Sequence, residues 1–140
     1  MWDYLIITAS NDVQAAGYRA QLDRRVQLGL LPQVEHVRVV ADPGGVRIGS
    51  GGSTLLCLMT VLTERLGAAA ADSACCRSEL SGLRILILHA GGDSKRLPAY
   101  GPCGKIFVPV PGQSDRGLPV TLFDRQLPTY LDLPAPSCGG

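Results

Sequence analysis

Short apolar runs, separated by longer stretches that contain polar residues, divide the chain into alternating predicted strands and helices. Residues 4–9, 34–41 and 83–88 are mostly apolar and rich in β-branched residues or leucine. Such runs are typical of strands in a parallel sheet, which are buried on both faces. Residues 106–110 form a fourth apolar run, and Pro109 within it predicts an edge strand or the end of a strand.

A helix is predicted between the first two strands. Ser10, Asn11 and Asp12 are suitable N-cap residues, and Gly29 and Pro32 end the helical pattern. The apolar side chains that can share one stripe, and that we expect to be buried, are Val13, Ala16, Leu22, Val26 and Leu30.

Two more helices are predicted, over residues 53–66 and residues 121–131, although Pro128 interrupts the second of them. Residues 67–82 lack a clear pattern and are predicted as a connection. The expected buried face of the helix over residues 53–66 consists of Leu55, Leu58, Met59 and Leu62.

The order of these elements predicts an α/β fold with a mostly parallel sheet and crossover helices. Ligands of such sheets bind beyond the carboxyl ends of the strands. Two glycine-rich segments, residues 49–52 and the pair Gly91 and Gly92, each follow a predicted strand. We therefore expect both segments to open on the same edge of the sheet.

The second glycine segment is followed by three cations, Lys95, Arg96 and Lys105. Glycines leave backbone N–H groups uncovered, and lysine and arginine neutralise phosphate oxygens, so this order predicts a nucleotide site. The simpler interpretation is a tight turn that needs positive φ at the glycines. Neither a Walker A sequence nor a G-x-G-x-x-G dinucleotide sequence occurs in the chain.

The three cations have distinct predicted roles. Lys95 and Arg96 would bind the β- and γ-phosphates and stabilise the departing diphosphate, with arginine providing the bidentate contact. Lys105 would contact the α-phosphate or the sugar phosphate. The alternatives are a solvated basic turn for the pair and a surface lysine at the start of a strand for Lys105.

A second candidate cradle precedes the helix over residues 53–66. It comprises Gly49, Gly51, Gly52, Ser53 and Thr54. Free N–H groups at a helix N-terminus favour an anion or a base edge. Helix capping by Ser53 or Thr54 explains the same residues equally well. His89, directly after an apolar strand, is interpreted as a structural histidine.

Composition narrows the classes of partner and the compartment. A net charge of +1 and 5% aromatic residues argue against nucleic acid or an anionic membrane as a partner. Five cysteines without a C-x-x-C pair argue against a disulfide framework or a zinc site. With no basic segment at the N-terminus, the predicted location is the cytoplasm.

The passage from Leu88 to Pro98, with Lys105 after it, resembles the signature loop of sugar-1-phosphate nucleotidyltransferases. Ser94, Lys95 and Gly104 depart from the general pattern, which has Pro at the position of Gly104. These departures resemble the L-fucose-1-phosphate guanylyltransferases, including the bifunctional fucokinase/GDP-fucose pyrophosphorylases.

Two other segments, residues 2–23 and residues 42–55, resemble the same family in the same order. The resemblance implies the N-terminal portion of a Rossmann-like nucleotidyltransferase fold, in which residues 1–132 form the nucleotide-binding part and residues 133–140 a disordered or truncated tail.

The implied reaction converts GTP and L-fucose 1-phosphate to GDP-L-fucose and diphosphate with Mg²⁺. In the family an Asp on a later strand binds the metal, and no counterpart is assigned in this chain. The chain is therefore expected to be inactive alone, without the C-terminal part of the domain and a possible fucokinase domain. The alternative is a non-catalytic nucleotide-binding or regulatory module of the same fold. Base and sugar specificity rest on the resemblance alone.

Overall fold

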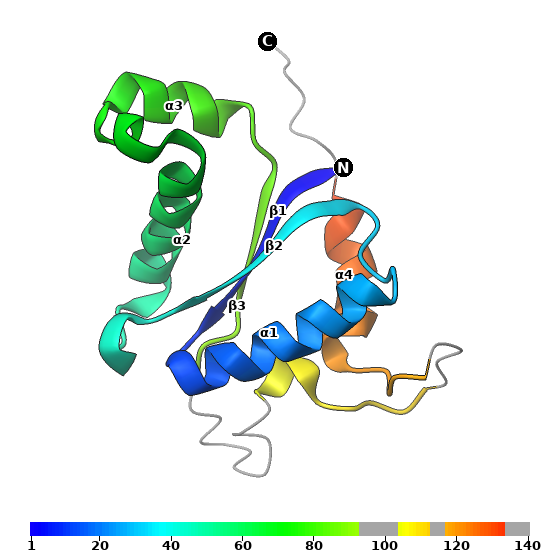
Figure 1. The fold of residues 1–140 in the computed structure, drawn as a ribbon. Helices are drawn as coiled ribbons and strands as arrows, with labels where there is room; N and C mark the ends of the chain where they lie inside the picture. Colours follow the sequence, from blue (N-terminus) through cyan, green and yellow to red (C-terminus); the bar gives the residue numbers. More distant parts are fainter. Residues whose placement is uncertain (93–103, 113–116, 134–140) are drawn as a thin grey trace.

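A computed structural model describes residues 1–92, 104–112 and 117–133 of the chain. Three strands, β1 (Trp2–Ala9), β2 (Val34–Ala41) and β3 (Ile85–His89), form a sheet in the order β2-β1-β3. Both pairings are parallel, and Leu5 of β1 lies opposite Val37 on one side and Leu86 on the other. The expectation of an α/β fold with a parallel sheet is confirmed (Figure 1).

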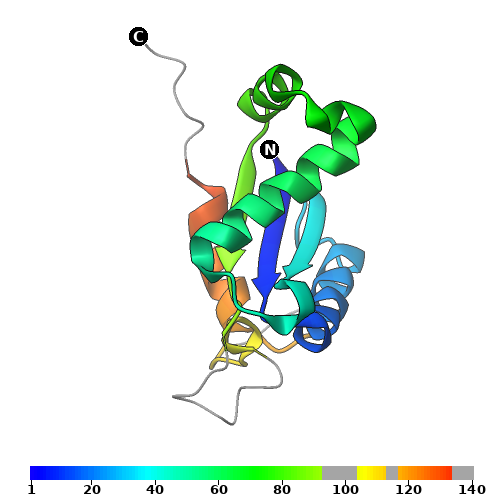
Figure 2. The ribbon, with the colours of Figure 1, turned by 90° about the vertical axis from the view of Figure 1, so that its left-hand side faces the viewer.

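The helices cover the two faces of this sheet. The crossover helix α1 (Asp12–Gln27) lies on one face together with α4 (Leu122–Leu131), while α2 (Gly49–Leu66) lies across the other face (Figures 1 and 2). Side chains of β1 alternate accordingly. Leu5 and Ile7 pack in the cluster that contains residues of α1 and α4, whereas Tyr4 and Ile6 pack against Cys57 and Val61 of α2.

The connection between α2 and β3 is more ordered than its sequence pattern predicts. It contains the 3-10 helix η2 (Gly67–Ala71) and the α-helix α3 (Ser73–Ser81). The side chain of Asp72 accepts hydrogen bonds from the N–H groups of Ala74 and Cys75 and so caps α3. A local cap therefore starts a helix for which the apolar pattern gives no signal.

The predicted buried face of α1 is largely wrong. Val13 is 85% exposed and Val26 is 52% exposed, and of the predicted stripe within α1 only Leu22 is fully buried. The face that packs on the sheet consists of Gln14, Ala15, Tyr18, Leu22 and Arg25. Polar side chains occupy this face because they find hydrogen-bond partners there.

The predicted buried face of α2 is also wrong. Leu55 and Met59 are 60% and 55% exposed. The buried positions are Ser53, Cys57 and Val61, which are spaced four residues apart along the helix. By length and composition alone the segment Gly49–Ala71, with a mean hydropathy of 1.4, could cross a membrane, so the predicted lack of a membrane partner stays a prediction.

The fourth predicted strand is not formed. Residues Lys105–Phe107 make the 3-10 helix η4, and Pro109 makes a single antiparallel bridge with Thr121. Because proline has no N–H, it cannot donate to a sheet ladder. The helix predicted over residues 121–131 is confirmed as α4, which begins with a capping box formed by Thr121 and Asp124 and contains Pro128.

Candidate functional site

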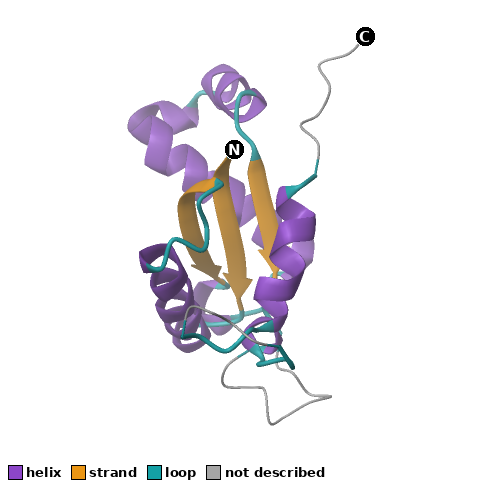
Figure 3. Ribbon diagram, turned by 90° about the vertical axis from the view of Figure 1, so that its right-hand side faces the viewer, coloured by secondary structure: helices purple, strands orange, loops and turns teal. Residues whose placement is uncertain are grey.

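The carboxyl ends of the three strands lie at one edge of the sheet (Figure 3). The chain runs from β1 to β2 on one side and then returns to β3 on the other side, so the topological switch point lies between β1 and β3. Gly49 and Gly91 line the same cavity at this edge. The expectation that both glycine segments open on one edge is therefore confirmed.

Gly91 is required by its contact with β1. A Cβ atom at Gly91 would lie 3.2 Å from the carbonyl carbon of Ala9 and 3.3 Å from the amide nitrogen of Ser10. Neither Gly91 nor Gly92 has a positive φ, so the interpretation as a positive-φ turn is wrong. Among the residues that the structure describes, none would lie within 4 Å of a Cβ at Gly92.

One cavity, which we call the lysine cavity, has a volume of about 290 Å³ and places the Gly91 and Gly92 backbone and Lys105 around the same space. Lys105 is exposed, so its ammonium group is accessible to an anion. The lining residues are His89, Ala90, Gly91, Gly92, Lys105, Ile106, Leu122 and Gln126.

The position of Lys105 depends on the residues that flank it. Gly104 has a φ of 66°, and the N–H of Phe107 donates to the Gly104 carbonyl oxygen at 3.3 Å. The Phe107 ring is buried, with its centroid 5.4 Å from the Tyr18 ring and 5.2 Å from the Phe123 ring. Lys105 therefore extends from a short turn that the aromatic core anchors.

A second cavity, which we call the serine cavity, has a volume of about 200 Å³ and lies between β1, β2 and the start of α2. It shares His89 and Gly91 with the lysine cavity. Its other lining residues are Thr8, Ser10, Asp42, Arg47, Gly49, Ser50 and Ser53.

The structure places α2 earlier than predicted, because the helix begins at Gly49 and not at residue 53. The amides left without an intrahelical acceptor therefore belong to its first turn, around Gly49 and Gly51, and not to Ser53 or Thr54. Gly49 and Ser53 line the serine cavity, whereas Gly51, Gly52 and Thr54 do not. Gly52 has a packing role, because a Cβ there would lie 2.9 Å from the Cβ of Ile48.

The alternative that Ser53 or Thr54 caps this helix is wrong. The N-cap residue is Ile48, and no side chain caps the helix. The Ser53 hydroxyl donates instead to Oδ1 of Asp42 at 2.9 Å, and the Thr54 hydroxyl donates to the Ser50 carbonyl oxygen at 2.9 Å. Ser53 thus links α2 to the residue that follows β2.

His89 has a side-chain partner, as expected for the structural histidine that the sequence suggests, and it also borders the candidate site. It is exposed, stands at the end of β3 and lines both cavities. Its Nε2 lies 3.1 Å from the Thr54 hydroxyl oxygen, and which of the two groups donates depends on the tautomer of the ring. The position of His89 between an apolar strand and two glycines is the sequence feature that indicates a place at this edge of the sheet.

Asp42 is the carboxylate that lines the serine cavity, and one of its oxygens already accepts from Ser53. Burial, with a smaller contribution from Asp42, raises the pKa of the nearby Cys57 thiol to about 11, so this cysteine is not a thiolate nucleophile. Among the described residues, no group of three His, Cys, Asp or Glu side chains could bind a metal ion.

Two of the predicted site residues, Lys95 and Arg96, lie outside the described residues. Their predicted roles at the β- and γ-phosphates stay predictions. Of the predicted tail, residues 133–140, the structure describes residue 133 alone.

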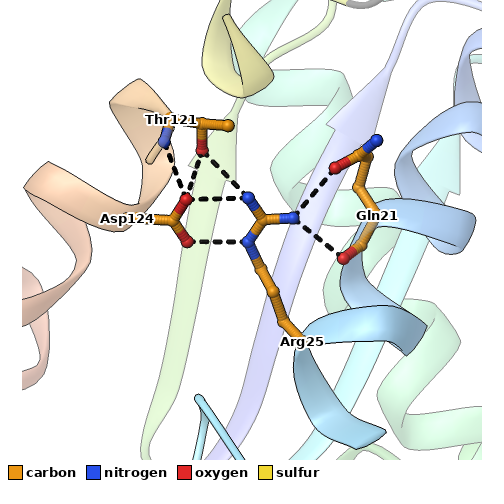
Figure 4. A network of polar contacts seen from close by, with 4 residues as sticks. All are labelled: Gln21, Arg25, Thr121 and Asp124. Carbon is orange, nitrogen blue, oxygen red and sulfur yellow. Dashed lines mark hydrogen bonds and ion pairs between the residues drawn. The ribbon is translucent and has the colours of Figure 1, made fainter. Parts of the chain in front are cut away.

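A buried network of polar side chains around Arg25 was not predicted from the sequence (Figure 4). Arg25 is 1% exposed, and its guanidinium donates to both carboxylate oxygens of Asp124 at 2.7 Å. It also donates to the Thr121 hydroxyl and to two oxygens of Gln21. Burial raises the pKa of Asp124, but hydrogen bonds from Arg25 and Thr121 outweigh it and leave the pKa lowered. The network joins α1 to the start of α4.

Comparisons with known proteins find sequences similar to this chain. The family of the fucose pyrophosphorylase domain matches residues 77–137. The chain is 35% identical to the fucose-1-phosphate guanylyltransferase of Mus musculus, over 96% of this chain and 20% of that protein. It is 39% identical to the bifunctional fucokinase/GDP-fucose pyrophosphorylase of Arabidopsis thaliana, over 79% of this chain and 11% of that protein.

The human fucose-1-phosphate guanylyltransferase is 34% identical over 95% of this chain. The chain spans about a fifth of the length of the mouse and human relatives. No solved structure matches the chain. The family match includes β3 and the segment with Lys105, and the similarity to the mouse and human relatives extends over nearly all of the chain. The resemblance to the fucose pyrophosphorylase family is therefore confirmed.

Proposed function

We propose that the carboxyl edge of the sheet binds GTP and that residues 1–132 supply the nucleotide-binding part of an L-fucose-1-phosphate guanylyltransferase. The observation that carries the proposal is the lysine cavity, where uncovered backbone at Gly91 and Gly92 and the exposed Lys105 line one space beside the switch point. The names of the relatives supply the substrate class.

In the proposed reaction, an oxygen of L-fucose 1-phosphate attacks the α-phosphorus of GTP, the bond to the diphosphate breaks, and diphosphate leaves. Lys105 neutralises charge where the two phosphates approach, and the Gly91 and Gly92 backbone permits close approach of phosphate oxygens. The protein contributes positioning and charge neutralisation, without a covalent intermediate. Mg²⁺, a cytoplasmic location and a separate fucokinase partner domain stay predictions.

The proposal is tested by titrating GTP, ATP, CTP and UTP with Mg²⁺ into the chain by calorimetry. GTP is expected to bind, and at a hundredfold excess over Kd it should stabilise the fold by about 2.7 kcal/mol. Lys105→Ala should weaken GTP binding about tenfold, as expected for the loss of one charge-assisted contact. The control is Arg24→Ala, which removes an exposed cation of α1 that lines neither cavity.

Equal melting curves with and without millimolar GTP would contradict the nucleotide site. Equal losses in Lys105→Ala and Arg24→Ala would show that only net charge matters and would remove Lys105 from the site. We also expect little GDP-fucose formation by this chain alone. Turnover near the enzyme median of about 10 s⁻¹ would contradict that expectation.

A further inference from the structure

Tyr18 of α1 contacts both backbone segments that border the lysine cavity. Its side chain is buried, and its hydroxyl donates to the carbonyl oxygen of Ala90 at 3.1 Å, across 72 positions of sequence. Ala90 directly precedes Gly91 and Gly92, so this hydrogen bond fixes the backbone at the point where β3 becomes the glycine segment.

The same phenol ring occupies the space beside Gly104. A Cβ atom at Gly104 would lie 1.9 Å from the Tyr18 hydroxyl oxygen and 2.4 Å from its Cε1, which no real contact permits. Gly104 directly precedes Lys105, and Phe107 on the far side of Lys105 packs edge-on against the Tyr18 ring. The backbone on both sides of Lys105 is thus shaped by Tyr18.

We propose that Tyr18 is a positioning residue of the nucleotide site. By binding Ala90 and filling the space beside Gly104, it fixes the spacing between the glycine backbone and Lys105 across the lysine cavity. The inference rests on the proposed function, since it assigns Tyr18 a part in presenting these groups to the GTP phosphates.

The chemistry of the phenol suits this part. Burial raises the pKa of Tyr18 to about 12, so the hydroxyl stays protonated and donates to Ala90 throughout the neutral range. The carbonyl of Ala90 would otherwise lose its partner in a half-buried position. Tyr4 offers a matched comparison on the opposite face, because it is equally buried and its hydroxyl donates to Glu64, far from the cavity.

The first test compares Tyr18→Phe with Tyr4→Phe in the 140-residue chain. GTP affinity is measured by calorimetry. Hydrogen exchange is measured by NMR at two amides: that of Ala90, which donates to the Thr8 hydroxyl oxygen, and that of Phe107, which donates to the Gly104 carbonyl oxygen. Tyr18→Phe should weaken GTP binding about fivefold, the effect of about one hydrogen bond. It should also accelerate exchange at both amides, whereas Tyr4→Phe should change neither quantity.

A purely structural tyrosine would give a different result. Tyr18→Phe would then lower the melting temperature while GTP affinity and exchange at the two amides stayed at the wild-type values, and this outcome would overturn the proposal. If the wild-type chain binds no GTP, the proposed function fails, but the exchange measurement still decides whether Tyr18 ties the two segments together.

The second test addresses the space beside Gly104. Gly104 has a φ of 66° and a ψ of 145°, a backbone conformation that alanine rarely adopts. Gly104→Ala therefore adds backbone strain as well as the collision with Tyr18. We expect the fall in melting temperature caused by Gly104→Ala to be smaller in a Tyr18→Ala background than in the wild-type chain, because only the strain remains there. An equal fall in both backgrounds would overturn the proposal.

Discussion

The two faces of the sheet are packed with different kinds of side chain. On the α1 and α4 face, the buried guanidinium of Arg25 lies over the rings of Phe107 and Phe123, 5.1 Å and 5.6 Å from their centres. The Tyr18 ring packs against Phe107 in the same cluster. On the α2 face, the buried cluster is small and its helix contributes only Cys57 and Val61.

This difference matters because each cavity depends on a different face. The lysine cavity includes residues of η4 and α4, which the aromatic cluster and Arg25 fix in place. The serine cavity includes the first turn of α2, whose attachment is lighter. We therefore expect changes in the α1 and α4 face to affect stability and the lysine cavity together, and changes in the α2 face to affect stability less.

Arg25→Ala should have the largest effect, a loss of about 3–5 kcal/mol in the free energy of unfolding, because it leaves Asp124 without its buried partner. Arg38→Ala is the control on the other face. It removes an ion pair with Glu64 in which both side chains are more than a third exposed. Its loss should cost less than about 1 kcal/mol in the free energy of unfolding. Urea denaturation of both variants provides the measurement, and similar losses would refute the contrast between the faces.

Val61→Ala should destabilise the fold by about 2 kcal/mol, because it removes buried methyl groups and leaves a cavity. Leu55→Ala, in the same helix, should change the free energy of unfolding by less than about 0.5 kcal/mol because Leu55 is largely exposed. Denaturation curves of the two variants should therefore differ clearly. A larger loss for Leu55→Ala would mean that α2 packs through the face that the sequence pattern predicts.

Gly91→Ala should cost about 1 kcal/mol, because the new methyl group forces the end of β3 away from the backbone of Ala9. Gly92→Ala should be nearly neutral for stability, since its Cβ would meet none of the described residues within 4 Å. Thermal unfolding compares the pair. If both variants were equally destabilised, the close approach to β1 would not be the reason for glycine at position 91.

Acid titration of stability separates the two ion pairs. The pKa of Asp124 is lowered because its hydrogen bonds outweigh burial, and that of Glu64 is lowered chiefly by its hydrogen bond from Arg38. Each carboxylate therefore contributes stability that is present above its unfolded pKa of about 4 and is lost as the pH falls through the folded pKa. Asp124→Asn should flatten this acid dependence more than Glu64→Gln, as followed by urea midpoints between about pH 2 and pH 6. Equal flattening would contradict the ranking.

The three observed strands and the edge at which they end could be predicted, because strands that helices cover on both faces are rich in apolar residues. The buried face of α1 could not. Arg25 is buried because it pairs with Asp124, 99 positions away, and Tyr18 packs where a glycine at position 104 leaves room. Local periodicity carries no information on such distant partners. The same applies to His89, whose partner Thr54 comes from another element.

The contact between Tyr18 and Gly104 also restricts how the family sequence can vary. The wider class of sugar-1-phosphate nucleotidyltransferases has Pro at the position of Gly104, yet a proline ring cannot adopt the φ of 66° found here. Replacement of this glycine requires a different backbone before Lys105 and a smaller residue at position 18. Positions 18 and 104 lie far apart in the sequence, but the Tyr18 ring brings them into contact. The residues at these two positions should therefore change together among natural sequences.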